Sequence, residues 1–115
     1  MQISAGDVLL ARFPYTDLSA DKRRPVLVLS VNNDGEDIIV CAITSKPYDG
    51  PYDVLATPSD GTGLKVPSRV QFDKIATLAK TVISGRIGAM PLEFMALHKP
   101  LLLRVLGLVK PPMNR

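Results

Sequence analysis

Cysteine and histidine are nearly absent from this chain of 115 residues, which holds one of each, Cys41 and His98. A single cysteine excludes an intrachain disulfide, and Cys41 lies inside an apolar run, so we expect a protein of a reducing cytosol. A single histidine also excludes the pair of imidazoles that usually moves protons in hydrolysis. His98 falls on a predicted C-terminal helix, and we assign it no catalytic role.

Metal-binding and membrane signals are missing as well. The sequence has no Asp-x-Asp, His-x-His or Cys-x-x-Cys spacing, and its eleven acidic residues are scattered, so we expect neither a metal nor a cofactor. No apolar run approaches the roughly 18 residues of a membrane span, and the first residues lack the features of a signal peptide. We therefore expect a cytoplasmic protein without a membrane partner.

Charge is present with a mild positive excess. The formal net charge is +3 and the isoelectric point is about 9.2. This balance is compatible with a nucleic-acid partner and does not prove one.

Short apolar segments separated by turn residues dominate the chain and predict strands. A helix is expected only near the C-terminus, beginning about Pro91, broken or kinked at Pro100 and ended by Gly107. We interpret residues 1–109 as a single domain, mainly β, forming a small, partly open barrel with a C-terminal helix, and residues 110–115 as a flexible tail. The predicted strands are 7–13, 26–31, 37–44, 52–56, 68–73, 75–78 and 83–87.

One stretch, Lys22-Arg23-Arg24-Pro25 followed by Val26-Leu27-Val28-Leu29, joins cations to a buried strand. Pro25 favours an extended backbone at Arg24, so the guanidinium is expected at the rim of the core, where a phosphate can be bound in one geometry. A solvated arginine at a strand start is the alternative reading. The loop 14–23 before it is long for a compact domain, and we expect it to be mobile in the free protein and to move on binding.

Further polar residues are predicted to gather near Arg24. Thr44-Ser45-Lys46 closes the strand that follows the Asn32–Gly35 hairpin, so Arg24 and Thr44 should emerge at the same end of the strand pair. Arg69, Gln71 and Asp73 share the polar face of an alternating strand. Asp73 either accepts a proton or forms a structural ion pair.

Four motifs in order resemble the MazF/PemK family of toxins over residues 6–107. They are Gly6-Asp7-Val8, Arg24-Pro25-Val26-Leu27-Val28, Ala42-Ile43-Thr44-Ser45-Lys46 and Asp73-Lys74-Ile75-Ala76-Thr77-Leu78. The resemblance implies an SH3-like barrel of the CcdB/PemK type. It also implies a homodimer that cleaves single-stranded RNA, and mRNA in particular, without metal and is blocked by the acidic C-terminal peptide of a cognate antitoxin. DNA would be contacted only indirectly, through that antitoxin.

By the same resemblance, Arg24 and Thr44 are the expected catalytic residues, and Asp73 handles substrate. Metal-free cleavage has the 2′-hydroxyl attack its own phosphate, which requires a clamp on the developing charge. Arg24 suits this role, but a guanidinium keeps its proton too firmly to act as a good general base. The remaining expected substrate-binding residues are Arg23, Ser45, Lys46, Arg69, Gln71, Lys74 and Tyr15. Tyr48 is a second candidate, besides Tyr15, for stacking on an unpaired base.

Two alternative functions stay open at this point. The first is a toxin with the same barrel that binds gyrase, as CcdB proteins do, chiefly through its C-terminal helix. The second is a degenerate relative that binds RNA or an antitoxin without cleaving.

Overall fold

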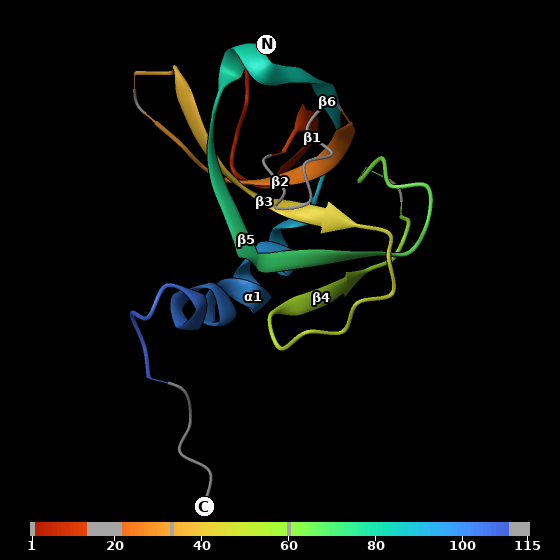
Figure 1. Ribbon diagram of the computed structural model, residues 1–115, viewed down its shortest axis with the longest axis vertical. Helices are drawn as coiled ribbons and strands as arrows, with labels where there is room; N and C mark the ends of the chain where they lie inside the picture. Colours follow the sequence, from red (N-terminus) through yellow and green to blue (C-terminus); the bar gives the residue numbers. More distant parts are fainter. Residues whose placement is uncertain (1, 14–21, 33, 60, 111–115) are drawn as a thin grey trace, which may run out of the picture.

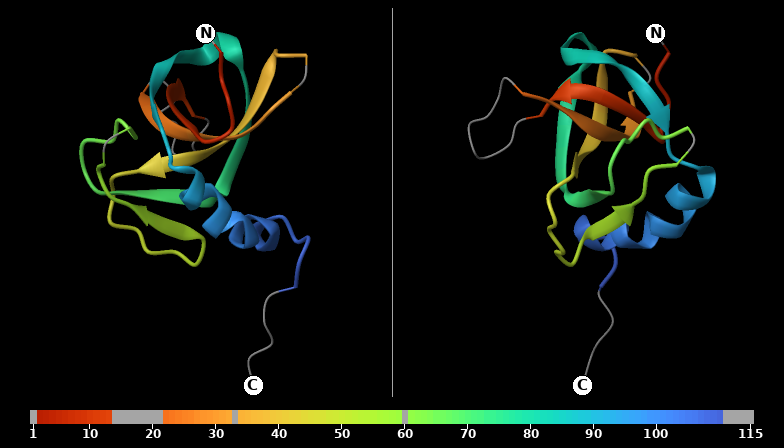
Figure 2. Two further views of the ribbon diagram at one scale, coloured as in Figure 1. Left: turned by 180° about the vertical axis from the view of Figure 1, so that it is seen from behind. Right: turned by 90° about the vertical axis from the view of Figure 1, so that its right-hand side faces the viewer.

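The computed structural model describes residues 2–13, 22–32, 34–59 and 61–110. Its strands pair antiparallel in one sheet with the order β4-β5-β3-β2-β1-β6. The sheet curls into a partly open barrel, with α1 at one end beside β4 and β5 in all three views (Figures 1 and 2). This confirms the predicted fold class. The elements are β1 (Asp7–Arg12), β2 (Arg23–Val31), β3 (Asp37–Thr44), β4 (Asp53–Ala56), β5 (Ser68–Ala79), a 3-10 helix (Lys80–Val82), β6 (Ile83–Ala89) and α1 (Leu92–Val105).

The central strands β2 and β3 are almost continuously apolar because both of their faces are buried. Val26 and Val28 pack in a cluster inside the barrel, whereas Leu27 between them packs in a second cluster. In β3, Val40 likewise belongs to the first cluster and Cys41 to the second. Since successive side chains of a strand point to opposite faces, two cores require apolar residues at every position. The second core lies between the sheet and α1.

The long strand β5 corrects one boundary prediction. Residues 68–73 and 75–78 were expected as two strands, but they form one continuous strand with an irregularity in its pairing with β3. Cys41 lies opposite Ile75 and the next residue, Ala42, lies opposite Gln71, so residues 72–74 are extra on the β5 side. Such a bulge bends a strand and redirects its side chains without ending it.

The C-terminal helix is not broken at its internal proline, whereas the alternative prediction of a kink at Pro100 stays a prediction. Pro100 lies inside α1, and the helix continues through it to Val105. Gly107 ends the helix as expected: it has a φ of 73°, its N–H donates to Arg104 O at 3.0 Å, and Leu108 N–H donates to Leu103 O at 2.9 Å. This bond pair is a Schellman motif. Among the described residues, no helix has the length and apolar character needed to cross a membrane.

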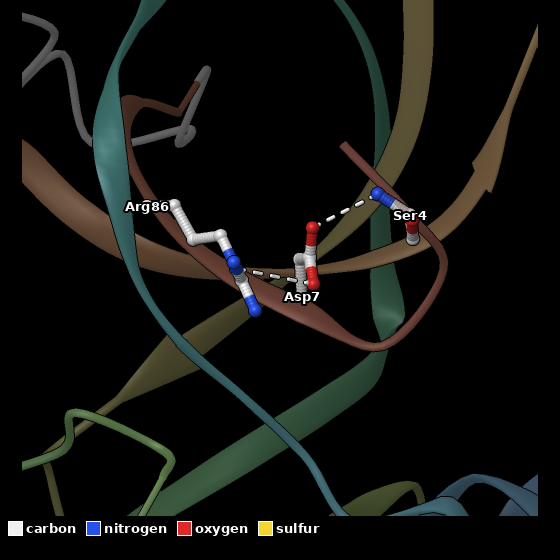
Figure 3. Close-up of polar contacts among 3 residues, drawn as sticks. All are labelled: Ser4, Asp7 and Arg86. Atoms are coloured by element: carbon white, nitrogen blue, oxygen red, sulfur yellow. Dashed lines mark hydrogen bonds and ion pairs between the residues drawn. The ribbon is translucent and has the colours of Figure 1, made fainter. Parts of the chain in front are cut away.

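The Gly6-Asp7 pair fastens the start of β1 to its neighbours. The Asp7 carboxylate accepts a hydrogen bond from Ser4 N at 2.8 Å and pairs with Arg86 Nε of β6 at 3.3 Å (Figure 3). Gly6, with a φ of 93°, donates its N–H to Val28 O of β2 and accepts one from Met90 N–H. This motif is therefore structural, and it lies apart from the pocket described next.

Candidate functional site

A pocket of about 600 Å³ opens where β2, β3 and β5 bring their polar ends together. It is lined by three groups of residues: the ends of β2 and β3, the loop from β3 to β4 with the start of β4, and the irregular part of β5. The lining residues are Arg24, Thr44, Lys46, Tyr48, Asp49, Gly50, Asp53, Gln71, Asp73 and Lys74.

The strand register explains why Arg24 and Thr44 meet in this pocket. Val26 of β2 lies opposite Ala42 of β3 in an antiparallel ladder. Arg24 and Thr44 are each two residues further toward the same end, and therefore on the same face as that pair. The sequence-based expectation that the two would emerge together agrees with this arrangement.

Hydrogen bonds within the loop and to neighbouring strands hold the loop between β3 and β4, residues 45–52, over the pocket. The Thr44 hydroxyl accepts one from Lys46 N–H at 3.2 Å, which leaves its own proton available for donation. Arg69 Nε donates to Tyr48 O at 2.9 Å. Gly50 N–H donates to Asp53 Oδ2 at 3.0 Å, and Asp53 N–H donates to Gly50 O at 3.1 Å. These hydrogen bonds therefore fix the position of the pocket wall that this loop forms.

Charges of both signs line the pocket in equal number. Arg24, Lys46 and Lys74 are the cations, and Asp49, Asp53 and Asp73 are the anions. Asp73 is exposed and forms no ion pair within the described part of the chain, so the structural ion pair considered for it is not formed there. Such a mixed lining suits a ligand that carries both negative oxygens and N–H donors.

Behind Asp73 lies the buried thiol of Cys41. Burial, followed by the negative charge of Asp73, raises the pKa of Cys41 to about 12. The thiol therefore stays protonated at neutral pH and is unsuited to act as a nucleophile. Its place between sheet and helix makes it a small core residue.

The expected site residues divide into four groups. Arg24, Thr44, Lys46, Gln71, Asp73 and Lys74 line the pocket. Arg69 and Ser45 adjoin it, Arg69 through its bond to Tyr48 O and Ser45 by sequence. Arg23 lies elsewhere, with its Nε donating to Ser84 Oγ of β6 at 2.5 Å, and Tyr15 falls outside the described residues.

Three lining residues were missed from the sequence: Asp49, Gly50 and Asp53. Asp49 and Gly50 lie in the turn between the predicted strands 37–44 and 52–56, where Pro, Gly and Asp are common in any protein, and Asp53 lies in the predicted strand 52–56. The available signal was that this turn follows directly on Thr44-Ser45-Lys46, so its polar residues had to remain near the end of β3. Tyr48, expected as a stacking residue, is 51% exposed and does line the pocket.

A second hollow of about 370 Å³ lies between the sheet and α1, and it is mostly apolar. His98 lies there with its ring 4.6 Å from that of Phe94 and 6.0 Å from that of Phe72, measured between ring centres. Its surroundings lower the pKa of His98 through burial. Within the described ranges, no three His, Cys, Asp or Glu side chains are grouped so as to hold a metal ion.

Comparisons with known proteins agree with this geometry. The family model described as "PemK-like, MazF-like toxin of type II toxin-antitoxin system" matches residues 4–106. No curated protein matches the chain.

Solved structures extend the likeness over nearly the whole chain. An endoribonuclease from Mycobacterial species, in complex with its cognate antitoxin, is 26% identical, with 96% of this chain and 100% of that chain covered and a TM-score of 0.73. MazF from Deinococcus radiodurans is 25% identical, with 93% and 98% covered and a TM-score of 0.74. The Mycobacterium tuberculosis toxin MazF-mt6, 20% identical over 88% and 96% of the chains with a TM-score of 0.70, shares the fold.

Proposed function

The chain belongs to the PemK-like, MazF-like toxins of type II toxin–antitoxin systems, and from this premise we propose that it is an endoribonuclease that cleaves single-stranded mRNA in the cytoplasm without a metal ion. One observation carries the proposal. A half-buried guanidinium, that of Arg24, shares a pocket with a hydroxyl, two ammonium groups and three carboxylates. These are the groups needed to bind a phosphodiester and the base beside it.

The proposed reaction is attack of a ribose 2′-oxygen on the adjacent phosphorus. The O2′–P bond forms and the P–O5′ bond breaks, which leaves a 2′,3′-cyclic phosphate and a 5′-hydroxyl. Negative charge builds on the phosphoryl oxygens in the transition state. Arg24 binds two of these oxygens with its planar fork, and the Thr44 hydroxyl donates to one of them.

Two protons must move during this step. The 2′-hydroxyl loses one, and the Asp73 carboxylate is the acceptor we propose, because it lines the pocket without an ion pair among the described residues. The departing O5′ gains one from solvent water, which reaches the open pocket. Arg24 remains protonated throughout because an arginine guanidinium is not deprotonated in proteins.

The same pocket is also suited to bind an antitoxin. One similar endoribonuclease was solved in complex with its cognate antitoxin. We propose that an acidic segment of this protein's own antitoxin binds Arg24, Lys46 and Lys74 in place of RNA phosphates. We further propose that the toxin acts as a homodimer and reaches DNA only through the antitoxin.

The test is incubation of purified protein with a long single-stranded RNA in excess EDTA. We expect discrete fragments with 5′-hydroxyl ends. Arg24→Ala should reduce the rate about 10²- to 10³-fold, the usual cost of losing one group that stabilises transition-state charge. Arg104→Ala is the matched control, because Arg104 is an exposed residue of α1 outside the pocket.

Two results would contradict the nuclease. Equal cleavage by the wild type and Arg24→Ala would remove Arg24 from the mechanism. Intact RNA together with inhibited gyrase supercoiling would favour the gyrase-binding alternative, and RNA binding without product would favour a non-cleaving relative.

A further inference from the structure

Gln71 is a buried polar side chain with unused hydrogen-bonding capacity. It is only 6% exposed and lines the pocket. Within the part of the chain that the structure describes, its carboxamide forms no hydrogen bond, and its polar atoms are not among the fully buried atoms that lack a partner, so they remain accessible from the pocket. A carboxamide held in this state presents one acceptor and two donors to whatever fills the pocket.

The backbone holds Gln71 firmly in place. It lies in the middle of three strands, opposite Ala42 of β3 on one side and Asp53 of β4 on the other. The next residue, Phe72, donates its N–H to Tyr52 O at 3.1 Å and buries its ring in the core beneath α1. The backbone from which the Gln71 carboxamide extends is therefore fixed at the floor of the pocket. Selective recognition requires a side chain held on such a fixed backbone.

Asp53 stands beside Gln71 on the same face of the sheet. Its Oδ2 already accepts the Gly50 N–H at 3.0 Å, whereas Oδ1 makes no hydrogen bond to a described residue. Together the two side chains present two acceptors, Asp53 Oδ1 and Gln71 Oε1, next to one donor group, Gln71 Nε2.

We propose that Gln71 and Asp53 recognise one base of the RNA and select adenine or cytosine; this inference rests on the proposed function in taking single-stranded RNA as the ligand. Both bases carry an exocyclic amino group beside a ring nitrogen that accepts. The amino group donates to Gln71 Oε1 and Asp53 Oδ1, and the ring nitrogen accepts from Gln71 Nε2.

Guanine and uracil fit this arrangement poorly. On its Watson–Crick edge, each presents a carbonyl oxygen where the same edge of adenine or cytosine presents the amino group, and that oxygen would face Asp53. A carboxylate can bind the two N–H donors of guanine when both of its oxygens face the base, but the Gly50 N–H holds Asp53 Oδ2 toward the loop backbone. Discrimination against these bases therefore comes from unpaired acceptors as well as from lost bonds.

Tyr48 completes the site. Its ring is half-exposed at the pocket wall, and its backbone oxygen is held by Arg69 Nε. A splayed base stacks on such a ring irrespective of its identity, which adds affinity without specificity. In this arrangement Tyr48 holds the base while Gln71 and Asp53 identify it.

The experiment measures binding separately from cleavage. The probes are short 2′-O-methyl oligouridines with a single adenosine, cytidine, guanosine or uridine analogue at the centre; they lack the attacking hydroxyl and cannot be cut. We expect fluorescence anisotropy to show the adenine or the cytosine probe binding roughly 5- to 150-fold more tightly than the other two. Comparing the adenine and cytosine arms identifies which base is preferred.

Two variants of Gln71 sharpen the result. Gln71→Met keeps the length of the side chain and should abolish the preference. Gln71→Glu replaces the donor with a second acceptor and should shift the preference toward guanine, whose N1–H and N2–H groups both donate. Gln2→Met and Gln2→Glu are matched controls, because Gln2 lines a different hollow with Arg86, Ile87 and Gly88, and they should retain the wild-type preference.

Equal binding of all four probes to the wild-type protein would overturn the proposal. So would a base preference that persists in Gln71→Met. Failure of the nuclease has a different signature: a base preference lost in Gln71→Met, combined with no cleavage of ordinary RNA containing the preferred base, supports base recognition and contradicts only the proposed reaction.

Discussion

Two hollows flank the irregular part of β5, and they differ in nearly every property. The larger pocket holds six charged residues and a buried carboxamide, whereas the smaller hollow against α1 is formed mainly by Leu29, Phe72, Met95 and Leu102. Neighbours in sequence are divided between them. Gln71 and Asp73 line the first, and Phe72 lines the second.

This division shows how one short segment serves both folding and binding. Alternation in a strand directs adjacent side chains to opposite faces, and the bulge at residues 72–74 moves Asp73 and Lys74 to the pocket without removing Phe72 from the core. Substitutions in the apolar hollow should therefore change stability and leave the chemistry of the charged pocket intact. Substitutions in the charged pocket should change that chemistry and leave stability intact.

The largest effect is expected for Phe72→Ala. Phe72 is 2% exposed and packs near Phe94 and His98, and removing a buried aromatic ring usually costs about 3–5 kcal/mol of unfolding free energy. Urea unfolding followed by circular dichroism measures this cost. Leu55→Ala, at a position 51% exposed on β4, is the control and should cost much less. An equal loss in both variants would contradict the division.

The corresponding change on the polar side is Arg24→Lys. Lysine keeps the charge and loses the planar fork that binds two phosphate oxygens. We expect cleavage to slow at least about tenfold, within the roughly 10²- to 10³-fold cost of a lost donor, while the unfolding free energy stays within about 0.5 kcal/mol of the wild type. Full activity in Arg24→Lys would show that only charge is needed.

The sequence predicted the apolar side of this comparison better than the polar side. The apolar runs of β2 and β3 and the glycine at residue 107 carry local signals, and these elements were found with boundaries close to those observed. The place of Arg24 opposite the end of β3 could be predicted from one local feature, the hairpin that joins β2 to β3. The place of Asp53 beside Gln71 and the hydrogen bond from Arg69 to Tyr48 O depend on how β4 pairs with β5, which is a long-range contact that no local pattern encodes.

Arg69 illustrates this limit and provides the next test. Its expected role in substrate binding stays a prediction, and the structure adds a hydrogen bond from its Nε to Tyr48 O that fixes the loop wall. We expect Arg69→Ala to raise the KM for RNA by up to about tenfold, with kcat little changed, because a hydrogen bond from a charged donor is worth roughly 1.5–3 kcal/mol and less when exposed. Arg69→Lys should restore part of the affinity. A fall in kcat at constant KM would instead place Arg69 in the chemistry.

The smallest effect concerns His98, which lines the apolar hollow together with Lys99. Burial lowers its pKa below the ordinary value of 6.5 in the folded protein, so just below that pH the unfolded chain binds more protons than the folded one. Stability should therefore fall as the pH is lowered through 6.5 and level off below the lowered pKa.

His98→Phe keeps a ring against Phe94 and removes the titration, so the difference in urea midpoint between the two proteins should grow as the pH falls over this range. A constant difference would mean that His98 is equally hydrated in both states. Because His98 lies outside the charged pocket, the pH dependence of RNA cleavage should be the same in both proteins, which separates the two hollows once more.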